Sequence, residues 1–123
     1  MMAGKARLFD DAAALRQILE APTPADAKKL GRKVQGFVET VWKQHCSSIV
    51  INASLLKFDQ NPNLGNFLLA TGDSVIVEAS PRDRIWGIGM SQNNPAAREP
   101  RQWRGQNLLG FALMTARRQL KGP

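Results

Sequence analysis

The chain contains one cysteine, Cys46, and one histidine, His45, among its 123 residues. A single cysteine permits no disulfide within the chain and no metal site built from several cysteines. The two residues are neighbours, and on a helix neighbouring side chains diverge by about 100°, so they do not form a paired nucleophile and base. The sequence therefore predicts neither a thiol protease nor a bound metal ion.

Long apolar stretches and leader-like segments are also missing. No apolar run approaches the roughly 18 residues that a membrane-spanning helix needs. Lys5 and Arg7 lie near the start, but no apolar stretch follows them as it would in a signal peptide. Hydrophobic residues make up 43% of the chain and charged residues 22%, which is an ordinary globular composition. We therefore expect one cytoplasmic domain spanning residues 1–123, without membrane contact.

Acidic residues are few relative to basic ones. The chain has ten Asp and Glu residues and seventeen Lys and Arg residues, which gives a formal net charge of +7. This balance favours anionic partners, such as nucleic acid or phosphate-bearing small molecules. The basic residues are spread along the chain, however, and no run of five or six like charges occurs. A solvated basic surface is the simpler interpretation, and a basic nucleic-acid-binding module stays open as an alternative.

Most of the chain shows helical periodicity. Thr23-Pro24 and Asn61-Pro62 each combine a capping residue with a proline at the first helical position, which marks a helix start. Elsewhere apolar residues recur at steps of three and four. We expect helices at residues 12–21, 25–33, 38–58, 62–69 and 107–120.

One segment differs from this pattern. Residues 74–79, Ser-Val-Ile-Val-Glu-Ala, have strong strand propensity and lie between Gly72 and Pro81. Residues 83–90 are rich in turn formers, and residues 91–106 form a long loop of the kind that often carries function. The sequence therefore predicts an α+β fold that is mostly α-helical, with a small β component.

The stretch from Glu78 to Gly89 is the strongest local candidate for a site. The end of the expected strand is followed by Asp83, Trp86 and two glycines, an arrangement that suits a flat, charged ligand. The simpler alternative is a surface turn in which Asp83 caps the backbone and Trp86 fills a gap in the core. Gly87-x-Gly89 is not a dinucleotide fingerprint, because the third glycine and the following helix are missing.

Several short motifs resemble the NADAR (YbiA-like) family in order and spacing over essentially the whole chain. They are MAGKARLF at 2–9, AKKLGR at 27–32, KFDQ at 57–60, LLATG at 68–72, VEAS at 77–80, DRIWGIG at 83–89 and GQNLLG at 105–110. The resemblance implies a single YbiA-like domain that hydrolyses N-glycosidic bonds without a metal or other cofactor. Implied substrates are phosphorylated ribosylaminopyrimidine intermediates of riboflavin biosynthesis, or ADP-ribosylated guanine, so nucleic acid would enter only as an ADP-ribosylated substrate. A non-catalytic domain that binds ADP-ribose or a nucleotide is the alternative.

The resemblance also implies roles for particular side chains. Cleavage of an N-glycoside passes through an oxocarbenium-like state that a carboxylate stabilises, and the departing base is held by stacking on an aromatic ring. A phosphate tail calls for lysine or arginine. The implied catalytic residues are Asp83 and Trp42, and the implied substrate-binding residues are Trp86, Asn107, Lys5, Arg32 and Lys57. On helical register alone, Trp42 is expected in the core.

Family members usually carry a glutamate, regarded as catalytic, in a segment ahead of the motif at residues 2–9, and this sequence starts after it. The resemblance therefore implies a domain that is truncated at its N-terminus relative to the family. We expect residues 1–123 alone to be weakly active or inactive and only marginally stable, unless Glu78 or Asp83 supplies the carboxylate.

Overall fold

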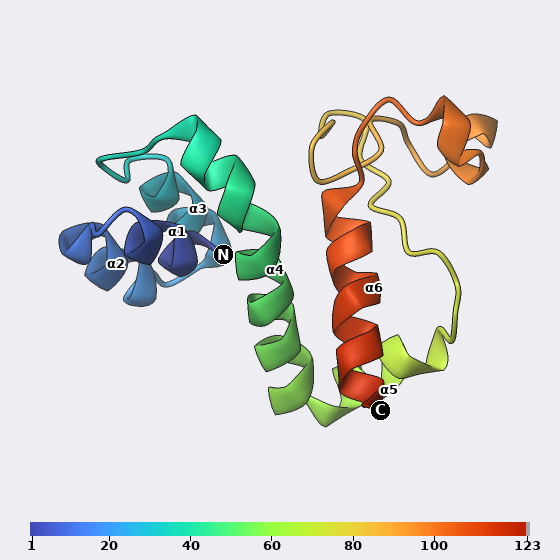
Figure 1. Cartoon of the computed structure of the whole chain (residues 1–123), viewed down its shortest axis with the longest axis horizontal. Helices are drawn as coiled ribbons and strands as arrows, with labels where there is room; N and C mark the ends of the chain where they lie inside the picture. The colour runs from blue at the N-terminus through green and yellow to red at the C-terminus, as the bar shows by residue number, and fades with distance from the viewer. Residues whose placement is uncertain (123) are drawn as a thin grey trace. The chain divides into compact units, whose positions relative to one another are not determined.

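The computed structural model describes residues 1–122, which form two compact units, one of residues 1–49 and one that begins at Val50. Helix α4 begins in the first unit and ends in the second (Figure 1). The elements are the α-helices α1 (Met2–Leu8), α2 (Ala12–Leu19), α3 (Pro24–Gly31), α4 (Glu39–Gln60), α5 (Pro62–Ala70) and α6 (Leu108–Lys121), and the 3₁₀ helices η1 (Pro95–Arg98) and η2 (Pro100–Gln102). The expected helices are all present, and α1, η1 and η2 are additional. Each helix described is too short or too polar to cross a lipid bilayer.

The predicted α+β fold is wrong, because the described residues contain no β-strand. Residues 74–80 have no regular secondary structure, although this is the segment with strand propensity. A strand needs a neighbouring strand to pair with its backbone groups. Here the partner is a single side chain, since the amide of Asn107 accepts from the N–H of Glu78 at 2.9 Å and donates to the carbonyl of Ile76 at 3.0 Å. The propensity of this segment therefore produces no sheet.

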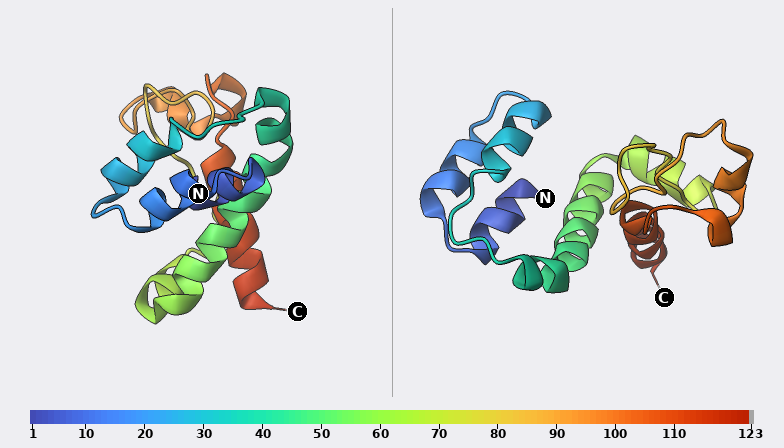
Figure 2. Two further views of the ribbon diagram at one scale, coloured as in Figure 1. Left: turned by 90° about the vertical axis from the view of Figure 1, so that its left-hand side faces the viewer. Right: turned by 90° about the horizontal axis from the view of Figure 1, so that it is seen from above.

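Helices α1, α2 and α3 pack on one another in the first unit (Figure 2). Their apolar faces meet in a small core made of Ala6, Ala14, Ile18 and Val34, with Met2, Ala3, Phe9, Leu15, Ala27 and Leu30 packed against it. Gly31 allows the close approach of α1 and α3, because a Cβ at this position would overlap the side chain of Met2. Small residues thus bring these short helices together.

Asp11 ties the start of α2 to a later turn of the same unit. Its Oδ1 accepts from the N–H of Ala14 at 3.0 Å and caps α2, while its Oδ2 accepts from the N–H of Gln35 at 2.9 Å. These bonds, that from Gln35 first and that from Ala14 second, hold the pKa of the Asp11 carboxyl below its usual value.

Helices α5 and α6 pack on each other in the second unit, and the guanidinium of Arg117 donates to the hydroxyl of Thr71 at 2.8 Å. Asn61 precedes Pro62 as expected, but its side chain does not cap α5. The Asn61 amide instead donates to the carbonyl of Lys57 at 2.7 Å and satisfies an orphan group at the end of α4. The capping prediction for this residue is therefore wrong, although α5 begins where the proline indicated.

Candidate functional site

The turn-rich segment 83–90 is fixed against the beginning of α6. The first N–H groups of a helix have no acceptor within the helix. In this chain Leu108 donates to the carbonyl of Ile85 at 3.1 Å and Leu109 to that of Trp86 at 3.1 Å. Just ahead of the helix, Asn107 donates to Gly87 at 3.0 Å. The loop carbonyls therefore satisfy the N-terminus of α6, and the loop and helix form one unit of structure.

Asp83 shapes this loop from within. Its Oδ1 accepts from the N–H of Ile85 at 3.0 Å and from the N–H of Trp86 at 2.8 Å. An aspartate that accepts from backbone groups two and three residues ahead is a turn-forming residue. This is the arrangement of the simpler alternative, and a catalytic role for Asp83 stays a prediction.

Replacing Asp83 tests its structural role. An asparagine keeps an oxygen in the place of Oδ1, so Asp83→Asn is expected to keep the free energy of unfolding within about 1 kcal/mol of the parent. Asp83→Ala removes the acceptor of two N–H groups and is expected to cost about 1–2 kcal/mol. Urea unfolding followed by circular dichroism measures both, with the exposed Asp73→Ala as the control. If the asparagine variant were as unstable as the alanine variant, the acceptor geometry would not be the reason that aspartate is present.

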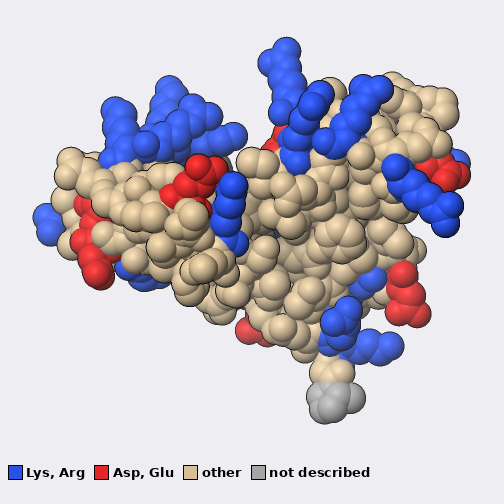
Figure 3. Space-filling view, turned by 45° about the horizontal axis from the view of Figure 1, so that its top comes forward, with Lys and Arg blue, Asp and Glu red and all other residues tan. Residues whose placement is uncertain are grey.

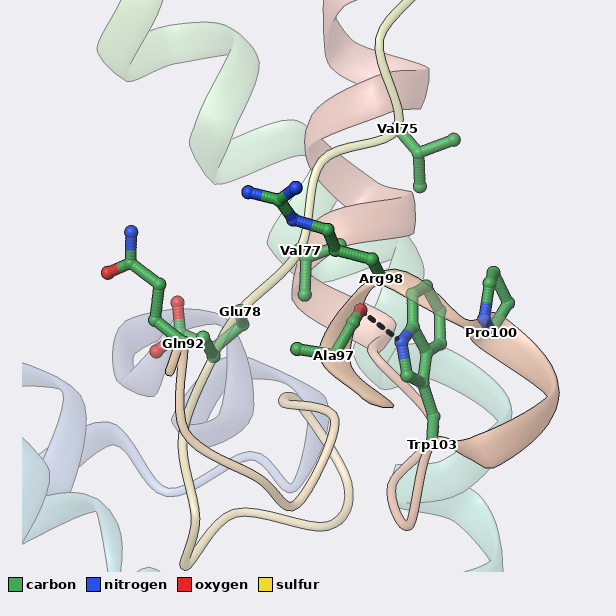
Figure 4. A pocket seen from close by; sticks show the side chains of 9 residues that line it. Val75, Val77, Glu78, Gln92, Ala97, Arg98, Pro100 and Trp103 are labelled. Atoms are coloured by element: carbon green, nitrogen blue, oxygen red, sulfur yellow. Dashed lines mark hydrogen bonds between the residues drawn. The ribbon is translucent and has the colours of Figure 1, made fainter. Parts of the chain in front are cut away.

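A pocket of about 710 Å³ lies beside this loop–helix unit, within the second compact unit. Its volume is in the range of small-molecule binding sites. Two chain segments form it, the extended residues before the loop and the η1–η2 region after it (Figure 4). The lining residues are Val75, Val77, Glu78, Ala79, Gln92, Ala97, Arg98, Pro100 and Trp103. None of the seven predicted site residues, all of which the structure describes, is among them.

Three side chains give the pocket its chemical character. In Figure 4, Glu78 and Gln92 lie on one side, Trp103 and Pro100 on the other, and Arg98 between them. The indole N–H of Trp103 donates to the carbonyl of Ala97 at 2.8 Å, which holds the ring against η1. A carboxylate, a guanidinium and an aromatic ring thus line the same pocket.

Trp103 was not among the residues that the sequence singled out. Behind the pocket its ring packs against Phe111 of α6, with ring centroids 6.4 Å apart and planes tilted by 57°. The sequence did offer one signal, a tryptophan inside a long arginine-rich loop. A large apolar ring in such a loop indicates that the loop packs against another part of the chain. Glu78 belonged to the predicted stretch, and the structure places it in the pocket.

The part of the sequence that contains Arg98 is rich in arginine. Residues 82–104 contain five arginines against two carboxylates, Asp83 and Glu99. Lys and Arg side chains extend from the surface in separate groups (Figure 3). Arginine binds phosphate and carboxylate groups through paired hydrogen bonds, so this composition favours an anionic ligand.

Two further predicted residues contact each other in the first unit. The ammonium group of Lys5 lies 5.7 Å from the ring centroid of Trp42 and 4.8 Å from that of Phe37. Phe37 in turn packs edge-on against Phe9, with ring centroids 5.3 Å apart. Burial lowers the pKa of the Lys5 ammonium group. Cation–π contacts hold this lysine in place.

The remaining predicted residues have different surroundings. Arg32 is exposed at the end of α3, and Lys57 is exposed on α4 with its ammonium group 5.6 Å from the ring of Phe58. Asn107 is fully buried, and both polar atoms of its amide are bonded to the backbone of residues 76 and 78. Because the Asn107 side chain is fully buried, a ligand could reach it only if the surrounding atoms moved. Substrate contact by these three residues stays a prediction.

The sequence profile of the NADAR domain matches residues 1–121. An N-glycosidase of Acanthamoeba polyphaga mimivirus is 44% identical over 119 residues, which cover 97% of this chain and 70% of that protein. An N-glycosidase of Nostoc punctiforme is 33% identical over 111 residues, which cover 90% of this chain and 64% of that protein. A chloroplastic riboflavin biosynthesis protein of maize is 37% identical over 112 residues, which cover 88% of this chain and 16% of that protein.

These relatives differ in length, and this chain spans less than two thirds of the Nostoc protein and a small part of the maize protein. Their names support an N-glycosidase function in the family. The match of the profile over nearly all of the chain agrees with the order and spacing of the short motifs at residues 57–60, 77–80, 83–89 and 105–110. The chain belongs to the NADAR family.

Proposed function

We propose that this chain is an N-glycosidase whose substrate binds in the pocket between residues 75–79 and 92–103. The observation that carries the proposal is the presence of Glu78, Arg98 and Trp103 in one pocket. Each of the three groups meets one need of the reaction. The related N-glycosidases support a glycosylated small molecule as the class of substrate.

The reaction breaks the bond between the anomeric carbon of a ribosyl group and a nitrogen of the base. Positive charge develops on the sugar as the bond lengthens, and a nearby carboxylate stabilises it. Water then adds its oxygen to the anomeric carbon, and the departing nitrogen takes up a proton. We assign the carboxylate to Glu78, because its side chain lines the pocket and forms no hydrogen bond to another described residue.

Trp103 and Arg98 hold the two ends of the substrate. The Trp103 ring is fixed by the carbonyl of Ala97 and by the ring of Phe111, so its position against a flat base is set before the ligand arrives. Arg98 provides a guanidinium for a phosphate group. The proposed substrates are a phosphorylated ribosylaminopyrimidine and, second, an ADP-ribosylated guanine. The maize relative, named for riboflavin biosynthesis, supports the first.

The test incubates the full chain with a ribosylaminopyrimidine phosphate and measures the free base by liquid chromatography. Time-dependent release of the base is expected. Quenching of tryptophan fluorescence by ADP-ribose without any release would instead identify a non-catalytic nucleotide-binding domain. Folded protein that shows neither release nor quenching at millimolar ligand would refute the proposal.

Arg98→Gln is expected to raise KM for the phosphorylated substrate about tenfold or more, because a hydrogen bond to a charged group is lost. The matched control is Arg101→Gln in η2, three residues along the chain and outside the pocket lining. This control should leave KM unchanged. Equal effects of the two substitutions would point to the general positive charge of the region and not to a phosphate site in the pocket.

A further inference from the structure

The side chain of Asn107 takes the place of a β-strand behind the pocket. In a parallel ladder, one residue of the neighbouring strand accepts from an N–H and donates to the carbonyl two residues earlier. The Asn107 amide does the same, accepting from Glu78 N–H at 2.9 Å and donating to the carbonyl of Ile76 at 3.0 Å. The segment that carries Glu78 is thus held by a side chain 29 residues away.

Asn107 is itself fixed in three ways. Its backbone is in the left-handed region, with φ 53° and ψ 38°, which asparagine tolerates better than most residues. Its N–H donates to the carbonyl of Gly87 at 3.0 Å. Gly110, one turn along α6, leaves the space that the amide fills, since a Cβ there would lie 2.6 Å from Asn107 Oδ1 and closer still to Nδ2 and the oxygen of Ile76. The position of the Asn107 amide is therefore restricted by its own backbone and by the space that Gly110 leaves.

The backbone carbonyl of Glu78 is also held by hydrogen bonds. Its carbonyl accepts from the N–H of Ile88 at 3.0 Å and from the N–H of Ser80 at 3.1 Å. The backbone of this residue is therefore tied to the helix start on one side and to the loop on the other, while its side chain lies in the pocket. Fixing the backbone restricts where the carboxylate can go, because few rotatable bonds separate the two.

We propose that Asn107 is a positioning residue, which places the Glu78 carboxylate in the pocket by holding the backbone of residues 76–78 from behind. This inference rests on the proposed function and assigns to Asn107 a part different from substrate contact. Its amide is fully buried, and each of its polar atoms already forms a hydrogen bond to the backbone. Its effect on the reaction passes through Glu78.

Asn107→Asp is the sharpest variant, because the shape is kept and an acceptor for the Glu78 N–H remains. The donor to the Ile76 carbonyl is lost and an oxygen replaces it. A misplaced reacting group slows a reaction by about 10- to 100-fold, so kcat should fall by that factor with KM changed less than about threefold. The control is Ala112→Gly, which weakens α6 at another buried position without touching the amide. It should leave kcat unchanged.

A double variant tests whether Asn107 acts through Glu78. If it does, Asn107→Asp should slow the reaction no further once Glu78→Gln is present. A full additional loss in the double variant, or a rise in KM with unchanged kcat in the single variant, would overturn the proposal.

Hydrogen exchange tests the same proposal without any activity. In the parent chain the Glu78 N–H should exchange at least about tenfold more slowly than those of Val77 and Ala79, which donate no hydrogen bond within the described residues. Asn107→Asp should accelerate exchange at Glu78. Equal exchange rates of the three amides in the parent chain would overturn the positioning role, whereas slow exchange at Glu78 in a chain that releases no base would reject the proposed function alone.

Discussion

Glu78→Gln is expected to reduce kcat for base release by about 100- to 1000-fold, the usual effect of removing one well-placed electrostatic group. The amide has the shape of the carboxylate but lacks the negative charge that stabilises a sugar cation. The Glu78 side chain is exposed and forms no hydrogen bond to another described residue, so the free energy of unfolding should change by less than about 0.5 kcal/mol. Single-turnover release of the base and urea unfolding measure the two quantities.

Glu99→Gln is the matched control for this experiment. Glu99 is an exposed carboxylate between η1 and η2, directly between two residues that line the pocket, and it does not line the pocket itself. Its replacement should leave kcat unchanged. A Glu78→Gln variant that retains at least a third of the parent kcat would show that another carboxylate carries the reaction, and a loss of activity in Asp83→Asn would then identify Asp83.

Gly105→Ala is expected to destabilise the second unit by about 3 kcal/mol or more, which is at the upper end for added volume in a packed site. A Cβ at residue 105 would lie 2.8 Å from Arg84 Cα and 2.9 Å from the carbonyl carbon of Ile88, and it would overlap the oxygen of Gly87. All three atoms belong to the backbone, so no side chain can rotate away. The loop would have to leave the start of α6 and lose the hydrogen bonds that join them.

The control for Gly105 is Gly72→Ala, which adds the same methyl group where no atom lies within 4 Å. Gly72 has a φ of +63°, so this substitution carries only the backbone strain of the left-handed region, about 1 kcal/mol. Unfolding in urea, followed by circular dichroism, compares the two variants. Losses of similar size would mean that the loop relaxes easily and that its contact with α6 is not tightly packed.

The helices could be predicted from the sequence because their signals are local. Thr23-Pro24 marks the start of α3, and the Thr23 hydroxyl accepts from the N–H of Asp26 at 3.1 Å as a capping residue should. The strand could not be predicted correctly, because propensity describes one segment and a sheet needs two. The partner of residues 76–78 is a side chain far along the sequence, and no short pattern reveals such a pair.

The candidate site was predictable only in part for the same reason. Asp83 and Trp86 lie three residues apart, and the structure joins them by a hydrogen bond, which local reasoning anticipated as a turn. The pocket combines residues 75–79 with residues 92–103, and its walls meet only through the folding of the loop between them. Trp103 carried no local motif, so its place opposite Glu78 could be seen only in three dimensions.

The replacement of a strand by one amide has a consequence for how this chain tolerates mutation. Backbone pairing in a sheet is nearly indifferent to sequence, because every residue except proline offers the same N–H and C=O. In this chain the two bonds depend on one residue, since among short side chains only asparagine carries a donor and an acceptor on two separate atoms. A saturation library scored by folding stability should therefore accept many residues at Val75 and Ala79, both exposed, and very few at Asn107 or Gly110.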